Sequence, residues 1–134
     1  MTLYHYTGLD HVDGILRDGL TMGVLPLWTV DGWQLVRGYQ WLTDDPGWQQ
    51  GWATNRTGIC GDRTAVRVAV EVPESERRNL FRWHLFALAV LRMDRRELQA
   101  FNAAGGSDGK SWWVYRGSIS TGWLGKWEQK PEAA

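Results

Sequence analysis

The sequence has little cysteine, no excess of either charge and no long apolar run. Cys60 is the single cysteine among 134 residues, which excludes an intramolecular disulfide and a cysteine cluster for zinc. Fifteen basic side chains balance fifteen acidic ones, so the molecule has no long-range attraction for nucleic acid or an anionic membrane. No apolar stretch approaches the roughly 18 residues of a membrane span, and the first residues do not read as a secretory signal. We therefore expect a soluble, cytoplasmic protein without membrane contact.

Several motifs of known chemistry are also missing. No stretch matches a Walker loop, a dinucleotide fingerprint, a metalloprotease helix, a zinc ribbon or a serine-hydrolase elbow. The histidines His5, His11 and His84 fall on three different expected elements, and no paired carboxylates supply the spacing of metal ligands. We therefore expect no metal site.

The chain does have enough apolar residues for one core, together with an unusual number of tryptophans. Hydrophobic residues make up 43% of the sequence, which suits a single core that needs neither disulfides nor metal. We expect one domain over residues 1–130 and a disordered tail over residues 131–134. Ten tryptophans exceed what such a core needs, so a few are expected to line a pocket or a contact surface.

Alternation and composition predict the strands. The expected strands are residues 2–7, 39–43, 63–72 and 111–117, with an edge segment at 122–127. The third is the clearest, because Val66, Val68, Val70 and Val72 share one face. Residues 21–40 read as irregular structure with one short strand, and residues 51–62 as an exposed loop.

Two helices are expected. Apolar residues from Leu9 to Leu20 recur at near-helical spacing, with Asp10 as the N-cap and Gly19 after the last turn. Residues 80–104 contain the longest helical stretch, with leucines on one side and charged residues on the other. The glycines within residues 105–109 end that helix.

His5 is the leading candidate for a functional side chain. It stands between Tyr4 and Tyr6 and directly precedes Thr7, Gly8 and the first helix. A histidine on a strand is more often structural than functional. An imidazole beside a glycine turn and a helix start can, however, offer a donor and several backbone N–H groups to a ligand hydroxyl or phosphate.

Short motifs follow one another in order along most of the chain. They are Leu3-Tyr4-His5-Tyr6-Thr7, a short helix ending in Arg17-Asp18-Gly19-Leu20, Trp41-Leu42-Thr43-Asp44-Asp45-Pro46, a basic valine strand, and Trp113-Val114 before Gly117 and Ile119. This order resembles the small bacterial ADP-ribosyltransferase-like proteins. It is more distantly similar to the RNA 2′-phosphotransferases and DNA-directed ADP-ribosyltransferases. The resemblance implies an α+β fold with a split, curved, mixed β-sheet and two main helices, gripping NAD in a cleft without a metal.

The resemblance also implies roles for residues of the first strand. His5 would anchor a ribose hydroxyl of NAD, and Thr7 with Gly8 would offer the backbone contact to the nicotinamide amide. Tyr4 and Tyr6 flank the histidine and complete the expected binding set on this strand.

On the second strand, Tyr39 or Trp41 would stack on nicotinamide, with the Thr43 hydroxyl beside it. Trp41 and Thr43 thereby join His5 as the expected catalytic residues. Arg63 or Arg67 would meet the pyrophosphate of NAD, because a guanidinium offers bidentate donors. For Arg67 an exposed strand face is an equal alternative.

The late strand departs from the pattern of the family. Many such transferases carry there a glutamate that holds the ribose hydroxyl and stabilises an oxocarbenium-like transition state. Residues 109–113 read Gly-Lys-Ser-Trp-Trp and hold no carboxylate. Asp108 is close but lies in a glycine-rich turn, and Glu71 and Glu128 are on other segments.

Three functions remain open. The leading hypothesis is an NAD-dependent transfer of ADP-ribose to a macromolecular acceptor, either protein or nucleic acid. The second is a module that binds NAD, ADP-ribose or a nucleotide without turnover, or that blocks a protein partner with its tryptophan-rich surface. The third is a nucleic-acid binder that stacks bases on indoles, which would need a group of arginines to gather on one face rather than form a solvated helix surface. These are Arg77, Arg78, Arg82, Arg92, Arg95 and Arg96.

Overall fold

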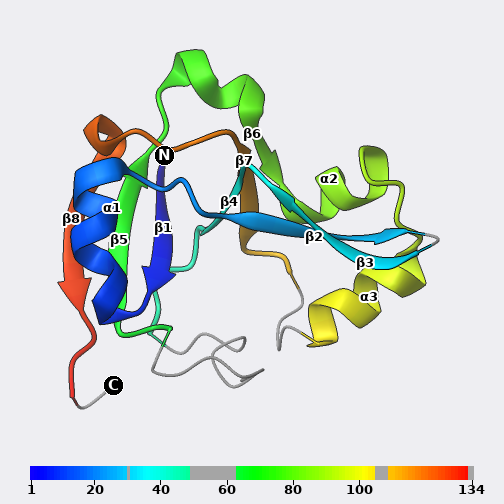
Figure 1. Ribbon diagram of the computed structural model, residues 1–134, viewed down its shortest axis with the longest axis horizontal. Coiled ribbons are helices and arrows are strands. Elements are labelled where there is room, and N and C mark those ends of the chain that lie inside the picture. The colour runs from blue at the N-terminus through cyan, green and yellow to red at the C-terminus, as the bar shows by residue number, and fades with distance from the viewer. Residues whose placement is uncertain (30, 49–62, 105–108, 133–134) are drawn as a thin grey trace.

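The computed structural model describes residues 1–29, 31–48, 63–104 and 109–132 (Figure 1). They form an α+β fold with a six-stranded sheet in the order β6-β7-β4-β1-β5-β8 and a separate two-stranded sheet. The strands of the large sheet are β1 (Thr2–Thr7), β4 (Tyr39–Thr43), β5 (Val66–Glu71), β6 (Leu80–Arg82), β7 (Trp112–Arg116) and β8 (Leu124–Gln129). All its pairings are antiparallel, so the expectation of a mixed sheet is wrong.

The sequence located most of these strands. The bounds of β1 and β4 are those expected, and Val66, Val68 and Val70 of β5 are fully buried on one face. The late strand and the edge segment are confirmed as β7 and β8. The expected loop at residues 51–62 lies outside the described residues.

The stretch expected to be irregular is a β-hairpin. Strand β2 (Val24–Thr29) pairs with β3 (Gly32–Arg37) over six residue pairs. Gly32 in the turn has a φ of 101°, which a glycine adopts at little cost. Pro26 is tolerated because β2 belongs to a two-stranded sheet, in which each strand keeps one unpaired edge.

The long helical stretch is divided into three elements. Strand β6 is followed by α2 (Trp83–Ala89) and, after a break, by α3 (Arg95–Ala104). Arg92 in the break has a φ of 55°. Asp94 then begins α3 with a reciprocal cap, since its carboxylate accepts from Glu97 N at 2.7 Å and Glu97 accepts from Asp94 N at 3.4 Å. The glycines expected to end this helix lie mostly at 105–108, outside the described part.

The first helix differs from expectation at its start. The chain enters it through a 3-10 turn, η1 (Leu9–His11), and α1 spans Val12–Asp18 without a side-chain cap, so Asp10 is not the N-cap. Gly19 follows the last turn with a φ of 82°, as expected. No described helix is long and apolar enough to cross a membrane.

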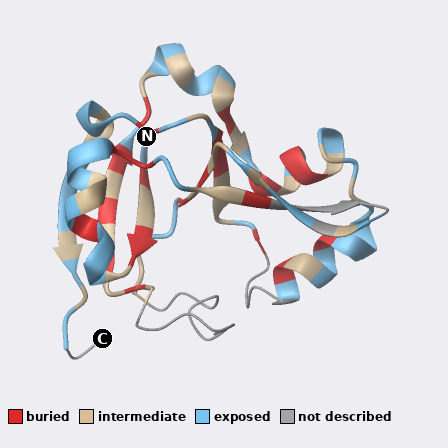
Figure 2. Cartoon of the chain, in the orientation of Figure 1, coloured by how far each residue is buried: buried red, intermediate tan, exposed pale blue. Residues whose placement is uncertain are grey.

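Two hydrophobic cores lie on opposite faces of the sheet. Neighbouring residues of a strand point to opposite faces, and Leu42 belongs to one core whereas Trp41 belongs to the other. On the first face α1 covers the sheet, with Val12 packed against Val66 and Val68. On the second face β2, α2 and α3 enclose a core around the fully buried Trp83. Figure 1 shows α1 beside β5, with the β2–β3 hairpin reaching across to α2 and α3, and Figure 2 shows the buried residues of these layers.

Candidate functional site

A pocket of about 490 Å³ lies between β1, α1 and the segment that follows α1. His5 and Thr7 of β1 line one side, and residues 19–23 line another. Its volume falls within the range of small-molecule sites, roughly 300–1,000 Å³. Two of the sequence-predicted residues are therefore brought together in one cavity. We call this cavity the β1–α1 pocket.

The imidazole of His5 is held in one orientation. Its Nδ1 lies 3.0 Å from the carbonyl oxygen of Trp41 on the neighbouring strand. A carbonyl can only accept, so Nδ1 carries the hydrogen and Nε2 is left as an acceptor. Burial lowers the pKa of His5 below its ordinary value, an effect that outweighs this hydrogen bond. His5 is thus a neutral ring that can accept a hydrogen bond from a ligand hydroxyl.

Residues around His5 complete this side of the pocket. Thr7 is buried and follows His5 on the same face of β1. The predicted residue Gly8 is not among the described lining residues; it precedes η1, and its carbonyl accepts from His11 N at 3.1 Å. The pocket lining therefore combines an imidazole and a hydroxyl from β1 with glycine backbone from α1 and the segment after it.

Hydrogen bonds hold residues 19–23, the pocket wall after α1, in place. Leu20 and Ile119 exchange two backbone hydrogen bonds of 3.0 and 2.9 Å. The buried amide of Gln40 accepts from Gly23 N at 3.0 Å and donates to Gly117 O at 3.1 Å. These bonds fix the wall in place before any ligand arrives.

Sequence reasoning missed Gln40 and Gly23 as parts of this site. Gln40 stands on the same face of β4 as Leu42, where a buried apolar side chain is expected, and this polar exception is the signal that was available. Gly23 has no space for a side chain, since an added Cβ would lie 2.0 Å from the Tyr39 carbonyl oxygen. Nothing in the local sequence reveals that contact, which depends on how the segment packs on β4.

The rim of the pocket is weakly acidic. Asp10, Asp18 and Arg17 line it together with His11. Arg17 is engaged by Asp18, with 3.0 Å between Nη2 and Oδ2, whereas the carboxylate of Asp10 lies 3.8 Å from His11 Nε2. Two carboxylates and one guanidinium leave the rim with a formal charge of −1 while the histidines are neutral.

Arg67 does not reach this pocket. It points to the other face of the sheet, where its guanidinium lies 4.4 Å from the ring centre of Trp48 and 5.5 Å from that of Tyr4. Glu128 on β8 accepts from it at 2.9 Å, and this bond lowers the pKa of Glu128. Arg67 also donates to the carbonyl of Pro46. These contacts give Arg67 a structural role, joining β5, β8 and the turn after β4.

The other residues predicted on the first two strands also lie away from His5. Tyr6 donates to the carbonyls of Asp45 and Gly47 in the turn after β4. Thr43 is buried and accepts from Asp45 N at 3.1 Å, which stabilises the same turn. These side chains hold the turn rather than line the β1–α1 pocket.

The aromatic rings of β4 belong to the second core. Trp41 donates to Val24 O at 2.9 Å and its ring centre lies 4.8 Å from that of Trp83. Tyr39 packs against Phe86 with 5.7 Å between ring centres. Only the backbone carbonyl of Trp41 contacts His5, and no described tryptophan lines the pocket.

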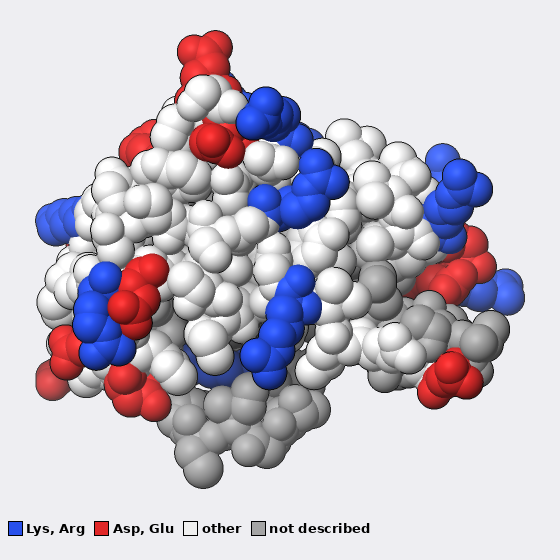
Figure 3. Space-filling model, turned by 45° about the horizontal axis from the view of Figure 1, so that its top comes forward, with Lys and Arg blue, Asp and Glu red and all other residues white. Residues whose placement is uncertain are grey.

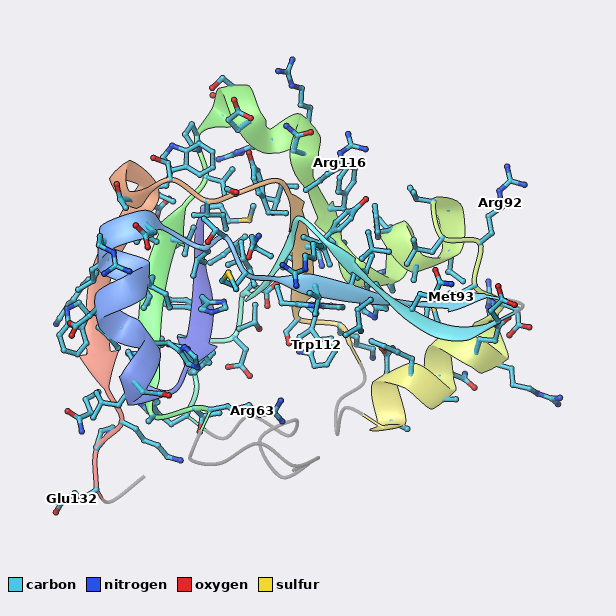
Figure 4. The ribbon with its side chains drawn as sticks, in the orientation of Figure 1. Arg63, Arg92, Met93, Trp112, Arg116 and Glu132 are labelled. Atoms are coloured by element: carbon cyan, nitrogen blue, oxygen red, sulfur yellow. The ribbon has the colours of Figure 1, made fainter. Side chains whose placement is uncertain are left out.

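Among the described residues, no glutamate lines the β1–α1 pocket in place of the missing late-strand carboxylate. Glu71 is exposed and bonded to Thr2, and Glu128 is paired with Arg67. Asp108 lies outside the described residues. Arg63 precedes β5 near its lower end in Figure 4 and is not part of the described pocket lining. The described carboxylates that line the pocket are those of Asp10 and Asp18.

Within the described part of the chain, no group of three or more histidine, cysteine or acidic residues could hold a metal ion. Comparisons of the chain with protein-family models, with curated proteins and with solved structures gave no match. The chemistry of the pocket is therefore the basis for the function that we propose.

Proposed function

We propose that the protein binds NAD, with the nicotinamide ribose half in the β1–α1 pocket, as an ADP-ribosyltransferase-like protein. The fixed orientation of His5 carries this proposal. A neutral imidazole with Nε2 as an acceptor suits a ribose hydroxyl, which must donate one hydrogen bond. The adjacent Thr7 hydroxyl can accept or donate to the same sugar or to the nicotinamide amide.

The charge of the rim decides which end of NAD enters. The nicotinamide ring of NAD is cationic and its pyrophosphate is anionic. A rim that holds Asp10, Asp18 and one paired arginine attracts the cationic end and repels phosphate. The pyrophosphate and adenosine then extend out of the pocket.

Transfer of ADP-ribose to a macromolecule is the second candidate function, and Asp10 favours it. A carboxylate near the nicotinamide ribose stabilises the positive charge that develops as the glycosidic bond breaks. Asp10 lines the same pocket as His5 and, unlike Asp18, is not held by an arginine. Binding alone needs only His5, Thr7 and the pinned wall.

Titration calorimetry tests the binding step. We expect NAD to bind wild-type protein and the affinity of His5→Ala to fall by about tenfold or more, the size of one buried hydrogen bond. His84→Ala is the matched control, because His84 lies on α2, outside the pocket. We also expect nicotinamide riboside to compete with NAD better than AMP does. Equal NAD affinity in wild type and His5→Ala, or no affinity in folded wild type, contradicts the proposal.

Nicotinamide release in the presence of cell lysate separates the two candidates. If transfer occurs, release requires Asp10. In Asp10→Asn release is then lost, while NAD still binds through His5 and Thr7, more weakly by the one rim charge removed. NAD binding without release from wild-type protein identifies a binding module.

A further inference from the structure

Four exposed arginines lie together at one end of the sheet. They are Arg37, Arg77, Arg78 and Arg116, and we call them the arginine patch. Arg77 and Arg78 lie on the 3-10 helix η3 (Glu74–Asn79), and Arg116 of β7 donates to Asn79 at the end of η3, at 3.3 Å. Figure 3 shows positive side chains following one another from the top toward the middle of one face, and Figure 4 shows Arg116 at this end of the molecule.

A backbone hydrogen bond places Arg37 near Arg116. It ends β3 and is followed by Gly38, whose carbonyl accepts from Gly117 N at 2.7 Å. Gly117 directly follows Arg116, so the end of β3 lies beside the end of β7. The patch is thus assembled from three segments that are distant in the sequence.

None of the four guanidiniums is neutralised by a carboxylate among the described residues. Arg17 and Arg67 form ion pairs among the described residues, and none of the four arginines of the patch does. The acidic side chain nearest to the patch along η3, Glu76, accepts instead from Tyr115 at 3.2 Å and from Asn79 at 3.3 Å. The patch therefore holds four positive charges that no ion pair neutralises among the described residues, with Glu74 and Glu76 on the same 3-10 helix as Arg77 and Arg78.

One guanidinium is already oriented. Arg116 lies over the ring of Phe81 with 5.4 Å between Cζ and the ring centre, and its Nη2 donates a hydrogen bond to Asn79 Oδ1. A guanidinium stacked on a ring keeps other edge N–H groups free for a bidentate contact with phosphate.

We propose that the arginine patch binds the phosphate backbone of a nucleic acid. Arginine without lysine, positive charge without an ion pair and an oriented guanidinium all fit a row of phosphates. No large exposed hydrophobic side chain is described on η3, β6 or β7, whereas on β3 Leu35 is 69% exposed, two residues before Arg37. The part of the patch formed by Arg77, Arg78 and Arg116 therefore lacks the apolar centre of a protein interface. The surface is assigned to a polyanion of phosphates rather than to a protein partner.

The patch differs from the arginine group that the sequence suggested. Of those six arginines it contains Arg77 and Arg78 only. Arg82 stacks on Trp113 at 4.7 Å. Arg92 lies to the right of Arg116 in Figure 4, in the break between α2 and α3, and Arg95 and Arg96 are on α3. Sequence proximity alone therefore groups these side chains wrongly.

Fluorescence anisotropy with a labelled oligothymidylate and a labelled duplex, each of about 20 nucleotides or base pairs, tests the proposal at low salt. We expect wild type to bind at least one of them, and Arg77→Gln/Arg78→Gln to bind about tenfold more weakly or worse. Losing two phosphate contacts should also reduce the slope of log affinity against log salt by about 1.4 to 1.8. The control Arg95→Gln/Arg96→Gln removes the same charge from α3 and should bind like wild type.

Three results overturn the proposal. They are no binding of either oligonucleotide by wild type, an equal loss in the patch and control variants, and equally tight binding of labelled polyglutamate. The proposal does not rest on NAD binding, so His5→Ala should bind the oligonucleotides like wild type. Circular dichroism of each variant confirms that it is folded.

Discussion

At the scale of single residues, His5 concentrates the chemistry of the pocket. A strand histidine is useful to a ligand only when one ring nitrogen is fixed and the other is free. The bond from Nδ1 to the Trp41 carbonyl meets the first condition, and the place of His5 in the pocket lining meets the second. Trp41 thus contributes its backbone rather than its ring to the site.

The lowered pKa of His5 predicts a pH dependence of stability. Folding favours the neutral ring, so the unfolded chain binds more protons below its ordinary pKa of about 6.5. The stabilisation by His5 is complete above that pH and is lost as the pH falls toward the folded pKa. Urea unfolding between about pH 8 and pH 5 should show a steeper loss in wild type than in His5→Gln, which has no group that titrates there.

The comparison isolates His5, because both proteins contain His11 and His84. Parallel curves for the two proteins across this range count against a buried, neutral His5.

At the scale of elements, the segment after α1 shows how a pocket wall is built from backbone. The wall depends on a glycine at position 23, where a Cβ would meet the Tyr39 carbonyl, and on the amide of Gln40.

Two alanine substitutions test whether the close contact at Gly23, rather than the loss of any glycine, matters for stability and NAD binding. Gly23→Ala should destabilise the fold by about 2 kcal/mol or more and weaken NAD binding, because the backbone must shift. Gly14→Ala, in α1, meets nothing within 4 Å and should stabilise the fold by about 0.5–1 kcal/mol. Urea unfolding of both variants measures the difference. A tolerated Gly23→Ala with unchanged NAD affinity contradicts the pinned wall.

Strands were predicted from the sequence more successfully than the segments between them. Alternation locates β5, whose valine face is buried, and aromatic and β-branched composition bounded by turn signals locates β1 and β4. The hairpin was missed although Asp31-Gly32, where β3 begins, is a turn signal. The break before α3 was missed because the apolar periodicity obscured the Asp94-x-x-Glu97 capping pattern.

At the scale of the whole molecule, the sheet divides the sequence-predicted site between two faces. His5 and Thr7 face α1, whereas Tyr4, Tyr6 and Arg67 face the turn after β4. Alternation along β1 predicts that His5 and Thr7 share one face and that Tyr4 and Tyr6 share the other. It does not predict the register of β4 and β5 against β1 or the position of α1, which arise from tertiary packing.

The net charge of the whole molecule likewise does not reveal the local charge of each surface region. A balanced count of charges predicts no affinity for a polyanion. The fold nevertheless gathers four arginines at one end, none of them ion-paired with another described residue, and places carboxylates on the rim of the β1–α1 pocket. Local charge, rather than net charge, therefore sets the ligands we propose for each region.

Nitrogen-15 NMR of the histidine side chains tests the central claim most directly. At neutral pH we expect His5 to be neutral with the hydrogen on Nδ1, and its Nε2 resonance to move when NAD is added. The resonances of His84, on α2, should stay in place. A protonated His5, the opposite tautomer, or a His5 spectrum that saturating NAD leaves unchanged would contradict the account.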